Sequence, residues 1–162
     1  MMNLAMPISI ADGDRSHAGA VKRIAKRAGL RNEVIHVQDG REALDFLFRR
    51  GRYVNCNQRQ PLVVLLDADL KGASGADVLR QLRGNSDVAN VPAIAMTSDG
   101  GREVNRSICS GPCACIRKPV QYRAFCDAAQ GLGLILRTTM VPAERPAVGV
   151  WSGPAVAILG DH

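Results

Sequence analysis

The stretch Pro61-Leu-Val-Val-Leu-Leu-Asp67-Ala-Asp69-Leu places five consecutive apolar residues between a proline and two carboxylates. Its β-branched members and its short length are typical of a strand that is buried on both faces of a parallel sheet. Open α/β sheets place their ligands at the carboxyl ends of the strands. We therefore expect Asp67 and Asp69 to lie at that edge of a sheet, either as solvated loop residues or as part of a site.

Segments with strand and helix patterns alternate on both sides of this stretch. The predicted strands cover residues 7–12, 33–38, 61–67, 91–96 and 113–117. The predicted helices cover residues 14–29, 41–50, 75–84, 102–110 and 122–129. The polar segment 51–60 has no periodic pattern, and we expect it to lack regular structure. Five strand–helix alternations predict an α/β fold in which helices cover both faces of a parallel sheet.

Polar residues follow four of the five predicted strands: Asp12, Asp67, Thr97 and Lys118. Their convergence at one sheet edge favours a site for phosphoryl transfer to a carboxylate. Asp67 is the candidate nucleophile, because an ionised carboxylate can accept a phosphoryl group. The carboxylates of Asp12 and Asp67, with the main-chain carbonyl of Asp69, are candidate ligands for Mg²⁺. Lys118 and Thr97 would contact the phosphoryl oxygens through a positive charge and a hydroxyl.

The order and spacing of these residues resemble the receiver domain of two-component response regulators over residues 7–131. The matching motifs are Ile-Ala-Asp12, Asp39-Gly-x-Glu42-Ala-Leu44, Leu-Leu-Asp67-x-Asp-Leu, Gly75-x-x-Val-Leu, Thr97-Ser98 and Gly111-Pro-x-x-x-x-x-Lys118-Pro119. The resemblance implies a flavodoxin-like (βα)5 fold with strand order 2-1-3-4-5. It also implies that Asp67 accepts a phosphoryl group from a sensor histidine kinase, that Thr97 and Lys118 are switch residues, and that the Lys118-Pro119 peptide is cis.

The polar segment from Arg50 to Pro61 indicates a narrower resemblance. Single-domain receivers that are paired with bacterial phytochrome histidine kinases carry a similar insertion. Such a protein is a phosphoacceptor rather than an enzyme with a separate substrate, and it signals by protein–protein contact.

The chain departs from the receiver pattern at three positions. Ala11 stands where the family has a first acid, Lys71 where it has a proline, and Cys115 where it has an aromatic residue. These departures support an alternative, a degenerate receiver that acts as a dimerisation or docking module without phosphorylation. A hydrolase of the haloacid-dehalogenase type would also place an acid where Asp69 stands, but its further acidic metal site late in the chain is missing from the sequence.

Composition places the protein among cytoplasmic proteins. The 162 residues carry a formal charge of +6 and five cysteines without framework spacing, which favours reduced thiols. No apolar run reaches membrane-spanning length, and the scattered arginines favour a protein partner over nucleic acid. We expect His17 on a helix surface and His36 in a strand, both outside the chemistry.

The last thirty residues do not match a receiver. We predict a receiver domain over 1–132 and a tail over 133–162, whose apolar runs alternate with Pro and Gly. Such runs either pack on their own domain or form an arm exchanged with a second subunit. We favour the arm, and therefore a homodimer, with Trp151 as its anchor.

Overall fold

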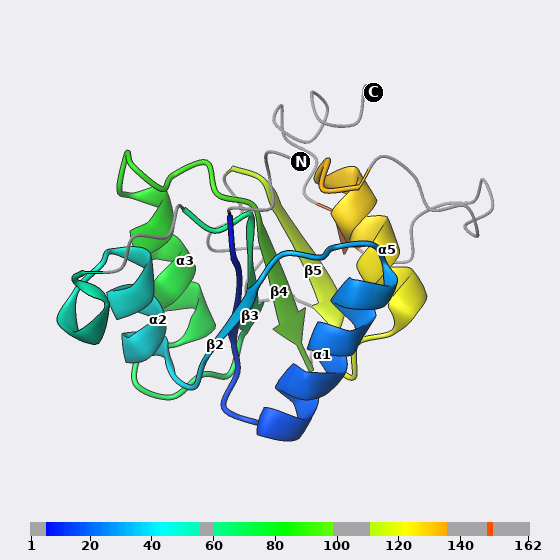
Figure 1. Ribbon diagram of the computed structural model, residues 1–162, viewed down its shortest axis with the longest axis horizontal. Coiled ribbons are helices and arrows are strands. Elements are labelled where there is room, and N and C mark those ends of the chain that lie inside the picture. The colour runs from blue at the N-terminus through cyan, green and yellow to red at the C-terminus, as the bar shows by residue number, and fades with distance from the viewer. Residues whose placement is uncertain (1–5, 56–59, 99–110, 136–148, 151–162) are drawn as a thin grey trace.

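A six-stranded sheet forms the middle layer of the computed structural model (Figure 1). The structure describes residues 6–55, 60–98, 111–135 and 149–150. The strands are β1 (Ile8–Ala11), β2 (Val34–Val37), β3 (Val63–Asp67), β4 (Ala93–Thr97), β5 (Cys113–Arg117) and β6 (Gly149–Val150). The spatial order is β2-β1-β3-β4-β5-β6, and the first five strands are parallel. The predicted receiver fold with order 2-1-3-4-5 is therefore confirmed.

Strand β6 belongs to the tail, for which the arm exchanged with a second subunit was the favoured expectation. Val150 pairs with Ala114 and Gly149 with Cys115, in an antiparallel arrangement along the free edge of β5. This part of the tail thus lies on its own domain in the structure. The rest of the tail, and the helix predicted over 102–110, lie outside the described residues.

Three of the helices begin after a polar residue whose side chain caps the helix. They are α1 (Arg15–Arg27), α2 (Gly40–Leu47), α3 (Gly75–Arg83) and α5 (Tyr122–Gly131), with a short 3-10 helix η2 (Gly51–Tyr53). The side chains of Asp14, Asp39 and Ser74 accept hydrogen bonds from the first turns of α1, α2 and α3, respectively. Residues 51–60 were expected to lack regular structure. This expectation is wrong for residues 51–53, which form η2 shortly after α2 ends.

Side chains on alternate strand positions enter two separate apolar clusters. Helices α1 and α5 cover one face of the sheet, where Ile10, Leu65 and Phe125 are buried. Helices α2 and α3 cover the other face, where Leu66 and Leu79 are buried. Because both faces are covered, the central strands can be apolar throughout, as the opening stretch predicted.

The side chain of Arg83 is hydrogen-bonded to the segments that lead into β4 and β5. Its guanidinium donates to the carbonyl oxygens of Ala89, Val91 and Pro112 at 3.0, 2.7 and 2.7 Å. Gly111 lies against this side chain, since a Cβ there would stand 2.7 Å from Arg83 Nε. One residue of α3 therefore holds the chain segments that enter β4 and β5.

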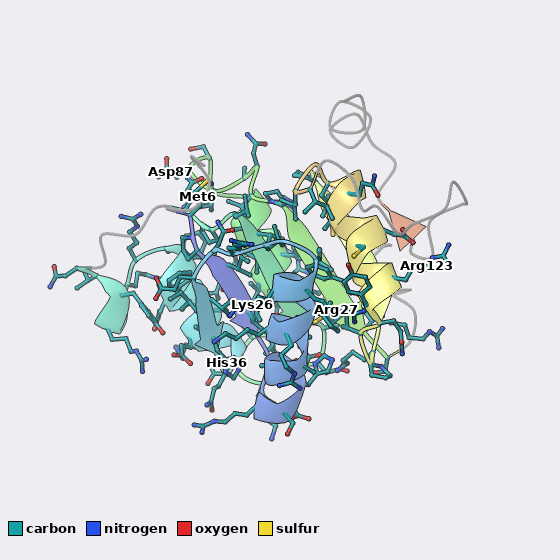
Figure 2. All side chains as sticks on the ribbon, turned by 45° about the vertical axis from the view of Figure 1, so that its right-hand side comes forward. Met6, Lys26, Arg27, His36, Asp87 and Arg123 are labelled. Carbon is teal, nitrogen blue, oxygen red and sulfur yellow. The ribbon has the colours of Figure 1, made fainter. Side chains whose placement is uncertain are left out.

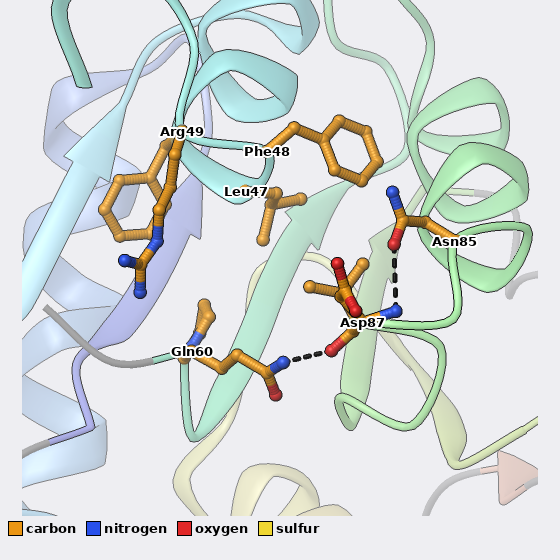
Figure 3. Close-up of a pocket in the computed structure, with 9 residues that line it drawn as sticks. Leu47, Phe48, Arg49, Gln60, Asn85 and Asp87 are labelled. Carbon is orange, nitrogen blue, oxygen red and sulfur yellow. Dashed lines mark hydrogen bonds between the residues drawn. The ribbon is translucent and has the colours of Figure 1, made fainter. Parts of the chain in front are cut away.

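A surface groove lies at the same amino end of the sheet, between the end of α2, the entry to β3 and the loop after α3 (Figure 3). Phe48, Gln60 and Asp87 are among its lining residues, and the Gln60 amide donates to the Asp87 carbonyl. Met6 and Asp87 mark this end in Figure 2, whereas His36 lies toward the other. The groove is thus remote from the predicted site. Among the described residues, no helix has the length and apolar character needed to cross a membrane.

Candidate functional site

Asp67 and Lys118 form an ion pair at the carboxyl ends of β3 and β5. Lys118 Nζ lies 2.8 Å from Asp67 Oδ1 and 3.7 Å from Asp69 Oδ2. The main-chain N–H of Asp69 donates to the same Asp67 oxygen at 3.0 Å. The sheet brings these residues together although 51 positions separate Asp67 from Lys118. Asp67 is 8% exposed, so this carboxylate is desolvated and still reachable from one side.

The surrounding acids control the charge of Lys118. Burial of its ammonium group acts to lower the pKa, but the hydrogen bond to Asp67 and the charges of Asp67, Asp69 and Asp12 raise it by more. The pKa of Lys118 is therefore raised above its usual value. A permanently charged ammonium group beside Asp67 suits the stabilisation of anionic oxygens.

Thr97 ends β4, next to β3 in the sheet. Its side chain is 1% exposed, and its hydroxyl has no hydrogen-bond partner within the described part of the chain. Its main-chain carbonyl accepts from Lys118 N at 2.8 Å, which places Thr97 beside Lys118. A buried hydroxyl without a partner is costly, so this group is available to a ligand that brings an acceptor.

Asp12 follows β1, and all of its polar groups have partners. Its N–H donates to Val37 O at 3.0 Å, and its carbonyl accepts from His36 Nε2 at 2.7 Å. One carboxylate oxygen accepts from Asp14 N at 2.9 Å, and the other contacts His17 Nδ1 at 2.5 Å. His17 and His36 lie in α1 and β2, the helix and the strand in which the sequence placed them, and both contact Asp12. These contacts were not predicted, and the expectation that neither histidine takes part in the chemistry stays a prediction.

The position of His17 in its helix explains this contact. Asp14 caps α1, so His17 is the third helical residue, and its N–H donates to Asp14 Oδ1 at 3.2 Å. Side chains at this position turn back toward the residues that precede the helix. The sequence signal was therefore a histidine three residues after a capping aspartate that itself follows a strand-end acid.

Two glycines enclose the loop that follows Asp67. A Cβ at Gly40 would stand 1.9 Å from the carbonyl oxygen of Ala73, and one at Gly75 would stand 2.7 Å from the Cα of Ala68. The N–H of Gly40 also donates to the carbonyl of Lys71 at 2.8 Å. The first turns of α2 and α3 thus fix the backbone that carries Asp67 and Asp69, and this approach requires glycine at both positions.

A comparison with family models matches residues 8–130 to the response regulator receiver domain. The match covers most of the chain and all five parallel strands. The chain belongs to the response regulator receiver family.

Solved structures of bacteriophytochrome response regulators are similar to this receiver. AtBRR is 29% identical with a TM-score of 0.72, and the alignment covers 86% of this chain and 98% of that chain. RtBRR is 28% identical with a TM-score of 0.69, covering 96% and 88% of the two chains.

A curated relative is the response regulator Rcp1 of Synechocystis sp., 28% identical over 91 residues. That match covers 56% of this chain and 60% of Rcp1, so it spans less than two thirds of the relative. A Mn²⁺-bound form of Rcp1 shares the fold, with a TM-score of 0.64 at 22% identity over 85% of this chain and 99% of that chain.

The receiver's departures from the family pattern have structural counterparts. Ala11 is fully buried in the cluster under α2 and α3, and Cys115 is 3% exposed in the same cluster. Lys71 is exposed, and the ion pairs found for the site acids among the described residues involve Lys118 and His17 instead. The Lys118-Pro119 peptide is cis, as the resemblance implied.

The predicted metal ligands have suitable chemistry but are not assembled. Asp12, Asp67 and Asp69 offer hard oxygen donors at one sheet edge, which suits Mg²⁺. Within the described residues, however, no three carboxylate, imidazole or thiol groups are placed to hold an ion together. Lys118 contacts Asp67 and Asp69, and His17 contacts Asp12. The carboxylates of Asp67 and Asp69 thus lie beside a lysine of the protein, and that of Asp12 is in contact with an imidazole.

Proposed function

We propose that this receiver is a cytoplasmic, single-domain response regulator that accepts a phosphoryl group on Asp67 from a sensor histidine kinase. The observation that carries the proposal is the Asp67–Lys118 pair at 2.8 Å beside the buried hydroxyl of Thr97, which has no partner among residues 6–55, 60–98, 111–135 and 149–150. The similarity to AtBRR and RtBRR supports a bacteriophytochrome as the kinase. The output is protein–protein contact rather than turnover of a separate substrate.

The chemical step is a displacement at phosphorus. An oxygen of the Asp67 carboxylate forms the new bond to phosphorus as the bond to the kinase's histidine nitrogen breaks, and that nitrogen keeps the electron pair. Lys118 Nζ, now on Asp67 Oδ1, is near enough to interact with the transferred oxygens, and Thr97 Oγ1 can donate to one of them. The hydrogen bond from Thr97 exists only in the phosphorylated state, so it draws β4 toward Asp67 and acts as the switch.

Asp12 and Asp67, with the main-chain carbonyl of Asp69, are the groups that would hold Mg²⁺ in this proposal. Their oxygen atoms fit a hard cation, and Rcp1 was crystallised in a Mn²⁺-bound form. When bound, the cation supplies positive charge that offsets the charge on the phosphoryl oxygens.

Phosphorylation of purified protein tests the proposal directly. With acetyl phosphate or a bacteriophytochrome kinase and Mg²⁺, the wild type should gain one hydroxylamine-labile acyl phosphate, measured by intact mass. Asp67→Asn should gain none. Asp77→Asn is a matched control, because Asp77 is an exposed carboxylate on α3 that pairs with Arg80. A wild type that gains no phosphoryl group would contradict the proposal and favour the degenerate receiver. Ala11 and the hydrogen-bonded carboxylate of Asp12 are the observations that support that alternative.

The proposal includes a homodimer formed through the tail and the elements around β4 and β5. Its support is the antiparallel pairing of β6 with the β5 edge, since an arm from a second copy could pair in the same register. Light scattering of the full chain and of a chain ended after Leu132 compares their masses. An unchanged oligomer after truncation refutes the arm.

A further inference from the structure

We propose that His17 competes with the divalent cation for the carboxylate of Asp12, and that this contact sets the cation affinity of the receiver. The inference rests on the metal role proposed for Asp12 and adds a residue that determines how tightly the cation is held. His17 is thus an internal occupant of the cation site, displaced when the ion binds.

The first step of the argument is that Asp12 has no polar group left over. Its carboxylate oxygens contact Asp14 N at 2.9 Å and His17 Nδ1 at 2.5 Å, and its main-chain groups are bonded to Val37 and His36. The residue is 1% exposed. A cation therefore reaches the carboxylate only after one of these neighbours has moved.

The second step is that His17 is the neighbour that can move. Asp14 N belongs to the backbone at the start of α1, and the Asp14 side chain caps that helix. Its displacement would break the helix start. The His17 ring needs only rotation about its side-chain bonds, and its side chain is 16% exposed. An Nδ1–H donor occurs in a neutral tautomer as well as in the charged ring, so the contact does not require a charged histidine.

The third step is the absence of a second acid at the end of β1. Ala11 is buried among apolar side chains, so Asp12 is the acid that β1 offers to the site. β1 supplies one carboxylate to the cation. The free energy needed to break its contact with His17 therefore lowers the cation affinity in full, because no second acid at this point can bind the ion in its place. The orphaned Nε2 of His17, which has no partner among the described residues, shows that the ring is held from one side.

Equilibrium metal binding tests the inference at one fixed pH. Free Mn²⁺ is measured by electron paramagnetic resonance, and Mg²⁺ affinity by competition with Mn²⁺. His17→Leu removes the donor and should bind both ions about tenfold more tightly, since a hydrogen bond to a charged group no longer has to be broken. His17→Asn keeps an N–H donor near the Nδ1 position and should remain close to wild type. Ser16→Ala, on the exposed face of the same helix turn, is the control.

The possible outcomes separate this inference from the proposed function. Unchanged or weaker binding in His17→Leu would overturn the inference, and weaker binding would make His17 a ligand. If Asp12→Asn loses the ion while His17→Leu matches wild type, only the inference fails; if Asp12→Asn binds normally, the proposed metal role of Asp12 fails first. Should His17→Leu not fold, imidazole nitrogen NMR of the wild type decides. Loss of the His17 Nδ1–H signal on adding Mg²⁺ supports displacement, and an unchanged signal refutes it.

Discussion

The amino and carboxyl ends of the parallel sheet differ in how far their buried polar groups are hydrogen-bonded within the protein. At the amino end, one guanidinium donates to three main-chain carbonyls, of which that of Pro112 also accepts from Ala93 N. At the carboxyl end, the hydroxyl of Thr97 is buried and has no partner in the part of the chain that the structure describes, and Lys118 is surrounded by three acids. The polar groups at the amino end are satisfied within the protein and contribute to stability. At the carboxyl end, the Thr97 hydroxyl and the Lys118 ammonium group can gain further interactions when a ligand binds. Groups that bind a ligand are thus stabilised less by the fold than groups that only support it.

Substitution at Arg83 should have the largest effect on stability. Arg83→Ala removes the guanidinium donor from the carbonyls of Ala89, Val91 and Pro112 and should lower the free energy of unfolding by about 3 kcal/mol. The Pro112 carbonyl keeps its bond from Ala93 N, so the loss comes mainly from the other two. Urea unfolding measures this change. Phosphorylation of the folded fraction should be unaltered, because the contact lies at the opposite end of the sheet.

Arg80→Ala is the matched control on the same helix. Arg80 forms an exposed ion pair with Asp77, and such pairs contribute little to stability. If Arg80→Ala and Arg83→Ala proved equally destabilising, the contrast between the two ends would lose its basis.

Substitution at Thr97 should have a smaller effect of opposite sign. Thr97→Val removes, at constant shape, a hydroxyl that has no partner among the described residues, and should raise the free energy of unfolding by about 1 kcal/mol. It should also abolish the phosphorylation-dependent shift of β5 amide signals in NMR spectra. Thr97→Ser keeps the hydroxyl and should retain that shift. A Thr97→Val variant less stable than wild type would mean that the hydroxyl is already bonded.

Tyr53 tests a satisfied polar group near the carboxyl end of β2. Its hydroxyl donates to Glu42 Oε2 at 2.8 Å, while Glu42 Oε1 accepts from Gln38 N. Tyr53→Phe should cost about 1 kcal/mol or less and leave phosphorylation unchanged, measured as above. Equal phosphorylation with lower stability would place this bond with the supporting contacts rather than with the site.

The pH dependence of the same contact has a defined sign. Burial and the hydrogen bond to Glu42 raise the pKa of Tyr53 to about 12. Because the folded pKa exceeds the unfolded value of 10.0, the stabilisation is complete below pH 10 and is lost as pH rises toward 12. An absorbance titration of the wild type should show a tyrosine that ionises with a pKa of about 12. This ionisation should be missing from the titration of Tyr53→Phe.

Much of the site could be predicted because strand ends in a parallel sheet share one edge. Asp12, Asp67 and Thr97 each end an apolar run, and Lys118 stands two residues after one, so the topology alone brings them near one another. Boundaries were less accurate: β4 begins at Ala93 rather than at Val91, because Pro92 has no N–H to donate and Val91 N donates to Val88 O in a turn.

The features that escaped prediction depend on contacts without a sequence period. The contact between His17 and Asp12 crosses a helix cap, and no apolar repeat marks it. Helix η2 is held by Tyr53, which bonds to Glu42 and packs edge-on against Phe46 with ring centroids 5.2 Å apart. Such contacts need the tertiary structure, because each joins polar or aromatic residues whose sequence positions suggest only loop and surface.

Gly40 and Gly75 have a consequence for how the receiver tolerates change. Each lies outside the chemistry, yet an added methyl group at either position would collide with the backbone that carries Asp67. In a mutational scan scored by phosphorylation, both positions should be as intolerant as the acceptor itself, although neither contributes a functional group. Sequence variation in the receiver is therefore limited by the space around the acceptor loop as well as by its reactive side chains.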